Sequence, residues 1–391
     1  MCVDNKLPKD LVLCLDGTGN EFGESNSNVV KLYATLTKSE RQVCYYHPGL
    51  GTQGDPNALT KLAKLWTKAL GLAFGYGLSR DLADAYSFLM AEYEPGDRLF
   101  VFGFSRGAYT ARALCGMLYM FGLLRRRQEV LMQYMIRMMG KAKDEESFRI
   151  ARQFRDTFSR QCPIYFLGVW DTVSSVGWVY SPVKIPFTRN NPDIHIARHA
   201  IAADERRAFY RQNLLGAPRP GQDFLQAWFA GVHSDVGGGS YPESESGLSK
   251  IALRWMLDEA RTAGLPLDEA KVREVLGQTG PAYALPDAAA RLHTSLHGLW
   301  WALEFCPKRH AFQTPSGKWV KKWELPMAKP RAVPANAVIH PSVEERRIRV
   351  ADYRPVNLPP GTAVHRPASA IWRLAAILAA AAAAVYLRFV R

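Results

Sequence analysis

The sequence lacks the cysteine spacings on which disulfide frameworks and zinc modules depend. Its 391 residues include only six cysteines, which lie far apart, and none of them belongs to a Cys-x-x-Cys pair. Secreted scaffolds and zinc fingers require closely spaced cysteines. We therefore expect free thiols in a reducing, cytoplasmic compartment.

Acidic residues are also scarce, and the amino terminus has no long apolar run. The chain has 36 acidic residues against 50 Lys and Arg, a formal net charge of +14. This balance favours an anionic partner, although the simplest interpretation of the short basic clusters is a solvated surface. Because no zinc-finger spacing, aromatic RNA-binding motif or basic region accompanies the charge, we expect an anionic membrane surface and no nucleic acid. Residues 1–10 lack the apolar core of a secretory signal, so we expect no signal peptide.

A long uncharged stretch occurs near the carboxyl terminus. Residues 374–387 contain no charged side chain, and eight of these fourteen residues are alanine. A bilayer span needs about 20 apolar residues. We predict a transmembrane or membrane-anchor helix at 370–389, after a proline-rich linker at 356–369, so that a cytoplasmic catalytic domain is membrane-associated. A helix packed on the domain is the alternative.

Short apolar runs alternate with helical patterns along the chain. The expected strands are residues 11–15, 43–46, 98–102, 164–170 and 227–232. The expected helices are residues 59–72, 78–93, 108–124, 198–214 and 248–262. This alternation predicts an α/β fold with a mostly parallel central sheet flanked by helices. Residues 265–340 show no sheet pattern, and we assign them to a cap or insertion within a single catalytic domain over 1–355.

One motif carries chemistry, the Gly-Phe-Ser-Arg-Gly sequence at 103–107. It follows an expected strand and opens an expected helix, which is the setting of the nucleophile elbow of α/β-hydrolases. The helix amino terminus directs backbone amides at a developing oxyanion. We predict Ser105 as the nucleophile and the Arg106 amide as an oxyanion donor. An ordinary glycine-rich turn is the alternative.

A serine nucleophile needs a base and an orienting carboxylate. Asp171 and His233 each follow an expected strand, so both belong at the carboxyl edge of the sheet with Ser105. We predict that these three residues form a triad. Asp235 is an alternative acid. The alternative for Asp171 is a role as a local turn cap.

The Asp-Gly-Thr-Gly-Asn turn at 16–20 follows the first expected strand. We predict that Gly17 or Thr18 supplies the second oxyanion amide, with Asp16 in the substrate-binding turn. The alternative is a tight turn that Asp16 merely caps. Two histidine pairs spaced for one helix face, His195 with His199 and His293 with His297, lack a carboxylate pattern, so we expect no metal and no cofactor.

Several segments together resemble one family. They are residues 15–20 (LDGTGN), 46–52 (YHPGLGT), 103–108 (GFSRGA), 169–173 (VWDTV) and 231–238 (GVHSDVGG). The sequence resembles the DUF2235 family, the α/β-hydrolase domain of Tle1-like type VI secretion phospholipase effectors, over roughly 11–360. The resemblance implies a Ser-Asp-His triad at Ser105, Asp171 and His233, and phospholipids as substrates. His47 departs from the aspartate expected in its turn.

We therefore expect a serine hydrolase that cleaves acyl esters, with a lipid or acyl-ester substrate and phospholipids favoured. Two alternatives stay open. One is an esterase acting on soluble small esters, and the other is a membrane-tethered, non-catalytic binding protein on a hydrolase fold. An intact set of serine, histidine and aspartate argues against the second.

Overall fold

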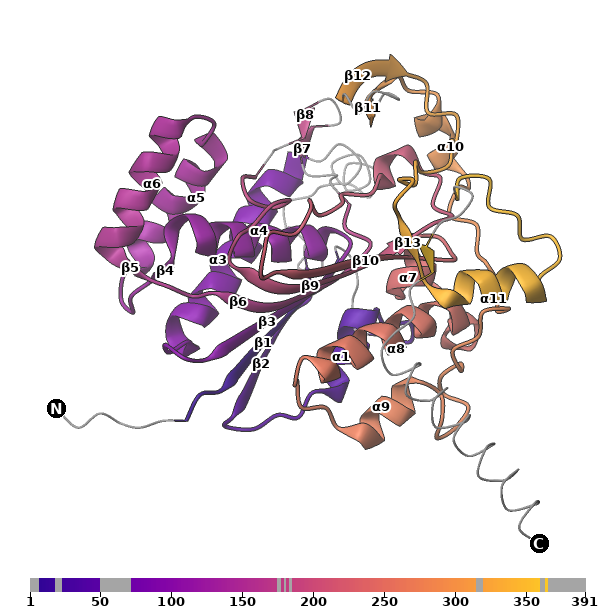
Figure 1. Cartoon of the computed structure of the whole chain (residues 1–391), viewed down its shortest axis with the longest axis horizontal. Helices are drawn as coiled ribbons and strands as arrows, with labels where there is room; N and C mark the ends of the chain where they lie inside the picture. Colours follow the sequence, from indigo (N-terminus) through magenta and orange to yellow (C-terminus); the bar gives the residue numbers. More distant parts are fainter. Residues whose placement is uncertain are drawn as a thin grey trace, which may run out of the picture.

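The computed structural model describes residues 7–17, 23–49, 72–173, 177–178, 181–182, 185–313, 319–358 and 363–364. A central sheet of eight strands, in the order β14-β13-β10-β9-β6-β3-β1-β2, runs through the middle of the molecule (Figure 1). All of its strand pairs are parallel. The strands are β1 Asp10–Leu15, β2 Gln42–His47, β3 Arg98–Phe104, β6 Ile164–Trp170, β9 Ile194–Ala202, β10 Asp223–Phe229, β13 Val338–Ile339 and β14 Ala363–Val364.

Helices cover both faces of this sheet (Figure 1). The α-helices that the structure describes are α1 Asn28–Thr35, α3 Leu72–Glu92, α4 Arg106–Phe121, α5 Met132–Lys141, α6 Glu145–Phe158, α7 His233–Gly237, α8 Gly247–Thr262, α9 Glu269–Val275, α10 Leu299–Glu304 and α11 Pro341–Arg349. Alternating residues of one strand enter opposite cores: Leu13 packs with α3 and α4, whereas Cys14 packs with α1 and α8. Both faces are buried, which explains why these strands are continuous apolar runs.

The chain order of the strands places a topological switch point at the carboxyl edge of the sheet. From β1 the chain goes first to β2 on one side and then to β3 on the other. Connections that leave in opposite directions open a crevice outside the carboxyl ends of neighbouring parallel strands. The loop after β1 and the turn after β3 both lie at this point.

The predicted parallel sheet and its flanking helices are confirmed, but the helix predicted at 198–214 is wrong. Residues 198–202 belong to β9, and a short 3₁₀ turn, Ala208–Tyr210, follows. Arg198 made this segment look amphipathic, yet its guanidinium bonds to Asp223 at 2.6 Å and to Glu259 at 2.5 Å. Pairing allows a charged side chain to be buried on a sheet face.

The segment at 265–340 contains strands, although no sheet pattern was expected there. It contains the antiparallel pair β11 Lys308–Gln313 and β12 Trp319–Glu324, and β13 joins the central sheet beside β10. Residues 363–364, within the proline-rich stretch predicted as a linker, form β14 and pair with β13.

Two predicted helices fall outside the described residues. These are the anchor helix at 370–389 and the helix at 59–72, of which the structure describes only the last residue. Among the helices that the structure does describe, none has both the length and the apolarity that a bilayer crossing requires.

The close crossing of α4 over β1 makes one glycine obligatory. A Cβ atom at Gly107 would lie 2.2 Å from the Leu15 carbonyl oxygen and 2.4 Å from that of Asp16. We expect Gly107→Ala to lower the free energy of unfolding by about 1–3 kcal/mol, because backbone has to move. Urea denaturation measures this change.

Gly140 provides the matched control, because it lies exposed in α5 and a Cβ there would meet no atom within 4 Å. Gly140→Ala should raise the free energy of unfolding by up to about 1 kcal/mol through helix propensity. Equal effects of the two substitutions would contradict the close crossing of α4 over β1.

Candidate active site

Ser105 lies in the turn between β3 and α4, with its backbone in a strained conformation. Its φ is 59° and its ψ is −120°, a region that residues with a side chain rarely occupy. The residue is 8 % exposed. Its Oγ atom lies 2.8 Å from Nε2 of His233. The sharp turn thus presents the hydroxyl at the carboxyl edge of the sheet, beside an imidazole.

His233 begins α7, directly after the loop that follows β10. Its Nδ1 atom lies 2.5 Å from Oδ2 of Asp171, so its two ring nitrogens face Ser105 and Asp171. The Phe104 ring stacks on the imidazole at 4.7 Å, and the Tyr210 ring meets it edge-on at 4.8 Å. The two aromatic rings limit rotation of the imidazole.

Asp171 follows β6 and is fully buried. Its Oδ1 accepts hydrogen bonds from the Ala202 amide at 2.9 Å and from Nη1 of Arg331 at 2.6 Å. Its Oδ2 accepts a further bond from Nη2 of Arg331 at 2.9 Å, in addition to the contact with His233. The carboxylate is therefore fully partnered, with a bidentate guanidinium on one side and an imidazole on the other.

These contacts set the charge state of the pair. Burial raises the pKa of the Asp171 carboxyl, but the Arg331 guanidinium and the bond from His233 outweigh it and hold that pKa below its usual range. Burial lowers the pKa of the His233 imidazole below 6.5, and the attraction of Asp171 only partly offsets this effect. Because burial outweighs the attraction of Asp171, His233 stays neutral near pH 7 and can accept a proton.

The residues predicted for the oxyanion hole lie around the elbow. Arg106 is the first residue of α4, at the helix amino terminus. The Gly17 amide donates to Oδ1 of Asp16 at 2.6 Å. Oδ2 of Asp16 accepts from Ser27 at 2.5 Å and from Tyr46 at 3.1 Å, so this carboxylate fixes the turn after β1. Thr18 lies outside the described residues.

The alternative acid, Asp235, points elsewhere. Its carboxylate lies 2.6 Å from Nδ1 of His293, whose Nε2 lies 3.1 Å from Glu245, and it also accepts from the Val232 amide. In the structure Asp235 therefore contacts His293 and supports the loop before His233 rather than touching the imidazole of His233.

The two histidine pairs do not meet as they would on a helix. His195 and His199 lie on β9, where four residues span about 13 Å. His199 is buried and neutral: burial lowers its pKa to about 3, and its Nε2 accepts from the Thr172 amide at 3.2 Å. His293 is buried and His297 exposed, in a segment without helix. Among the described residues, no cluster of three potential ligands could hold a metal ion.

Sequence reasoning missed two charged residues of the site. Arg331 lies in the segment assigned to an insertion, 160 residues after the carboxylate that it binds. Glu205 is fully buried and accepts from the His233 amide at 3.2 Å, from Arg207 and from Ser295. No local signal marks Arg331, because its partner is distant in the chain.

Comparisons with known proteins show a family match and one curated relative. Residues 9–259 match the family described as T6SS, phospholipase effector Tle1-like, catalytic domain. An uncharacterized protein of Saccharomyces cerevisiae is 35 % identical over 228 residues, which are 54 % of this chain and 33 % of that protein. The chain thus spans about a third of the length of this curated relative.

Two solved structures show weaker likeness. An uncharacterized protein from Pseudomonas aeruginosa aligns with a TM-score of 0.41 and 21 % identity, over 68 % of this chain and 49 % of that chain. The structure of the Tle1 effector bound to the VgrG spike from the type 6 secretion system aligns with a TM-score of 0.39 and 15 % identity. That alignment covers 83 % of this chain and 92 % of the other.

The buried ion pair of Arg331 with Asp171 predicts a large stability effect. Arg331→Leu leaves a buried carboxylate without its cation, so we expect the free energy of unfolding to fall by about 3–5 kcal/mol. Arg126→Leu is the matched control, since the pair of Arg126 with Glu94 is exposed and such pairs contribute below about 1 kcal/mol. Both values come from urea denaturation.

A double variant separates charge from packing. Arg331→Leu combined with Asp171→Asn should recover part of the lost stability, because the unpaired charge is gone. A double variant as unstable as the sum of both single variants would argue against the ion pair as the cause.

Proposed function

Because the chain belongs to the family of Tle1-like phospholipase effector catalytic domains, we propose that it is a serine hydrolase that cleaves the acyl esters of phospholipids. The observation that supports this most directly is the continuous series from Ser105 Oγ through His233 to Asp171, with contacts of 2.8 and 2.5 Å. Its order is that of a nucleophile, a base and an orienting acid. An α/β-hydrolase-like fold with the elbow at the switch point agrees with this reading.

In the first half of the reaction, Nε2 of His233 takes the proton of Ser105 as Oγ attacks the ester carbonyl carbon. The carbonyl oxygen becomes an oxyanion at the amino terminus of α4, where we assign the Arg106 amide as one donor. The Gly17 amide is bonded to Asp16, so it serves as a second donor only after releasing that bond. The C–O bond then breaks, and the imidazolium protonates the leaving alcohol.

In the second half, water attacks the acyl-serine. His233 accepts a proton from this water, and the collapse of the second tetrahedral intermediate returns a proton to Ser105 Oγ and releases the fatty acid. Asp171 keeps the Nδ1–H tautomer of His233 in place throughout. Arg331 holds Asp171 in its ionised form and aligns it, without touching the imidazole in any described contact.

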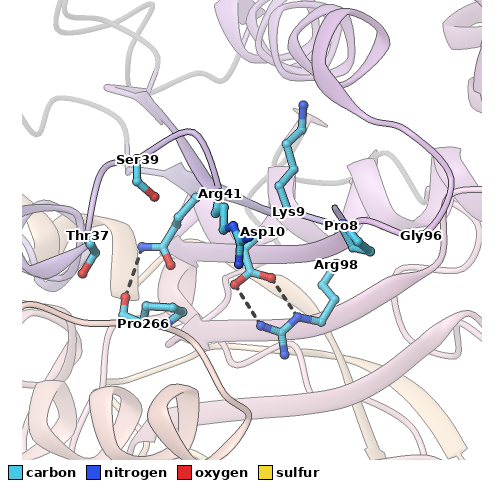
Figure 2. Close-up of a pocket in the computed structure, with 10 residues that line it drawn as sticks. Pro8, Lys9, Asp10, Thr37, Ser39, Arg41, Gly96, Arg98 and Pro266 are labelled. Carbon is cyan, nitrogen blue, oxygen red and sulfur yellow. Dashed lines mark hydrogen bonds and ion pairs between the residues drawn. The ribbon is translucent and has the colours of Figure 1, made fainter. Parts of the chain in front are cut away.

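Replacing the nucleophile tests the proposal directly. Ser105→Ala should reduce free fatty acid release from anionic phospholipid vesicles by on the order of 10⁴-fold or more and abolish fluorophosphonate labelling. Ser39→Ala is the control, because Ser39 is exposed and lines a pocket with Asp10 and Arg98, the first residues of β1 and β3, at the opposite, amino edge of the sheet (Figure 2). Equal release by wild type and Ser105→Ala would refute the serine mechanism. Labelling of wild type without fatty acid release would point instead to a soluble-ester substrate.

The state of His233 predicts the pH dependence. Only the neutral imidazole acts as the base, and its pKa is lowered by burial. Activity is therefore present above this pKa and lost as the pH falls through it. We expect kcat/KM for a soluble ester to be constant near pH 7 and to reach half its maximum below pH 6.5. A midpoint above 6.5 would contradict the assignment of a base whose pKa is lowered by burial.

A further inference from the structure

Five large apolar side chains stand exposed in one short part of the chain. They are Trp301 (46 %), Phe305 (57 %), Trp323 (55 %), Leu325 (45 %) and Met327 (50 %). We call them the apolar edge. Single exposed apolar residues are ordinary, but a concentration of this kind indicates an interaction surface.

The backbone brings the members of the apolar edge together on α10 and the β11–β12 pair, which lie close together in Figure 1. Trp301 and Phe305 are four residues apart, on one side of α10 and its end. Trp323 and Leu325 are two residues apart and share one side of the extended chain. The β11–β12 register opposes Lys308 and Glu324, and the Met327 amide donates to the Glu304 carbonyl at 3.2 Å. Phe305, just before the hairpin, and Met327, just after it, therefore lie next to each other.

A buried glutamate fixes this edge to the candidate active site. Glu304 is fully buried, and its carboxylate accepts from the Ala208 amide at 2.7 Å and from the Ala328 amide at 3.1 Å. Ala208 precedes Tyr210, whose ring contacts His233 at 4.8 Å and Trp300 at 5.4 Å. The exposed Trp301 directly follows Trp300, whose ring thus connects α10 to the aromatic residue that borders the imidazole.

The sequence of the same segment is mostly positive in charge. Residues 308–324 contain five Lys and Arg residues and a single acidic residue, Glu324. Tryptophan together with basic residues is the combination that suits the interface between lipid headgroups and acyl chains. Two copies of this segment would repel each other, which argues against self-association as the purpose of the edge.

We propose that the apolar edge is the surface by which the protein docks on an anionic phospholipid bilayer, and that this docking delivers lipid to Ser105. The proposal rests on the proposed function for its substrate. The edge enters the headgroup region, and the site beside Tyr210 then faces the membrane.

The test compares three full-length proteins on phosphatidylglycerol vesicles. They are wild type, the triple variant Phe305→Ser, Trp323→Ser and Leu325→Ser, and the control variant Val130→Ser and Ile348→Ser. The control side chains are 85 % and 84 % exposed but lie on other elements. We expect the triple variant to bind vesicles at least about tenfold more weakly, because three apolar groups no longer leave water. The control should bind like wild type.

Turnover gives a second, independent measure. For the triple variant, the ratio of vesicle hydrolysis to hydrolysis of a soluble short-chain ester should fall by at least about tenfold. The soluble ester reports on folding and on the Ser105 chemistry. Vesicle binding by the triple variant equal to that of wild type would overturn the proposal, since another part of the chain would then hold the protein on the bilayer. A wild-type dimer that the triple variant breaks, without loss of vesicle affinity, would overturn it in favour of self-association.

The two proposals fail in different ways. If wild type hydrolyses neither substrate while the triple variant still loses vesicle binding, the serine mechanism is refuted and the docking surface is supported. If wild type and the triple variant hydrolyse both substrates equally well, the docking surface is refuted and the serine mechanism is supported.

Discussion

The buried carboxylate of Asp171 connects parts of the molecule that are distant in the sequence. It accepts hydrogen bonds from β9 through Ala202, from α7 through His233 and from the carboxyl-terminal region through Arg331. An unpaired carboxylate at this depth would cost several kcal/mol, so these contacts make a large contribution to the stability of the structure. The family match ends at residue 259, yet the residue that compensates this charge lies at 331.

The same contacts explain how a strained site persists. Ser105 and Asp171 both have positive φ, at 59° and 38°, which is unfavourable for residues with side chains. Gly107 allows α4 to cross directly over the end of β1, while the network around Asp171 fixes the opposite side of the crevice. The strain at the two residues is therefore supported by packing on one side and by ion pairing on the other.

The segment from α10 to Arg331 has two different sides. Glu304 and Arg331 face inward and bond to the loop at Ala208 and to Asp171. Trp323, Leu325 and Met327 remain exposed between them in the sequence. Because the inner contacts are buried and charged, they hold the outer residues at a defined distance from the imidazole, which is what the proposed docking surface requires.

The sequence by itself determined the α/β class, the parallel strands, the elbow at Ser105 and the family. These features depend on local patterns: apolar runs between turns, and glycines where backbone approaches backbone. It also indicated Asp171 and His233, because residues that follow parallel strands of one sheet lie at the same edge. The helix predicted from the sequence at 198–214 was wrong, because ion pairs bury the charge of Arg198 on a strand.

Only the tertiary structure decided which carboxylate faces His233, and that Asp235 instead contacts His293. It alone revealed Arg331, whose partner Asp171 lies 160 residues away, and the contacts of Glu205 with His233 and Ser295. Such pairs leave no periodic trace, because long-range charge pairing depends on where the folded backbone places each end rather than on spacing along the sequence.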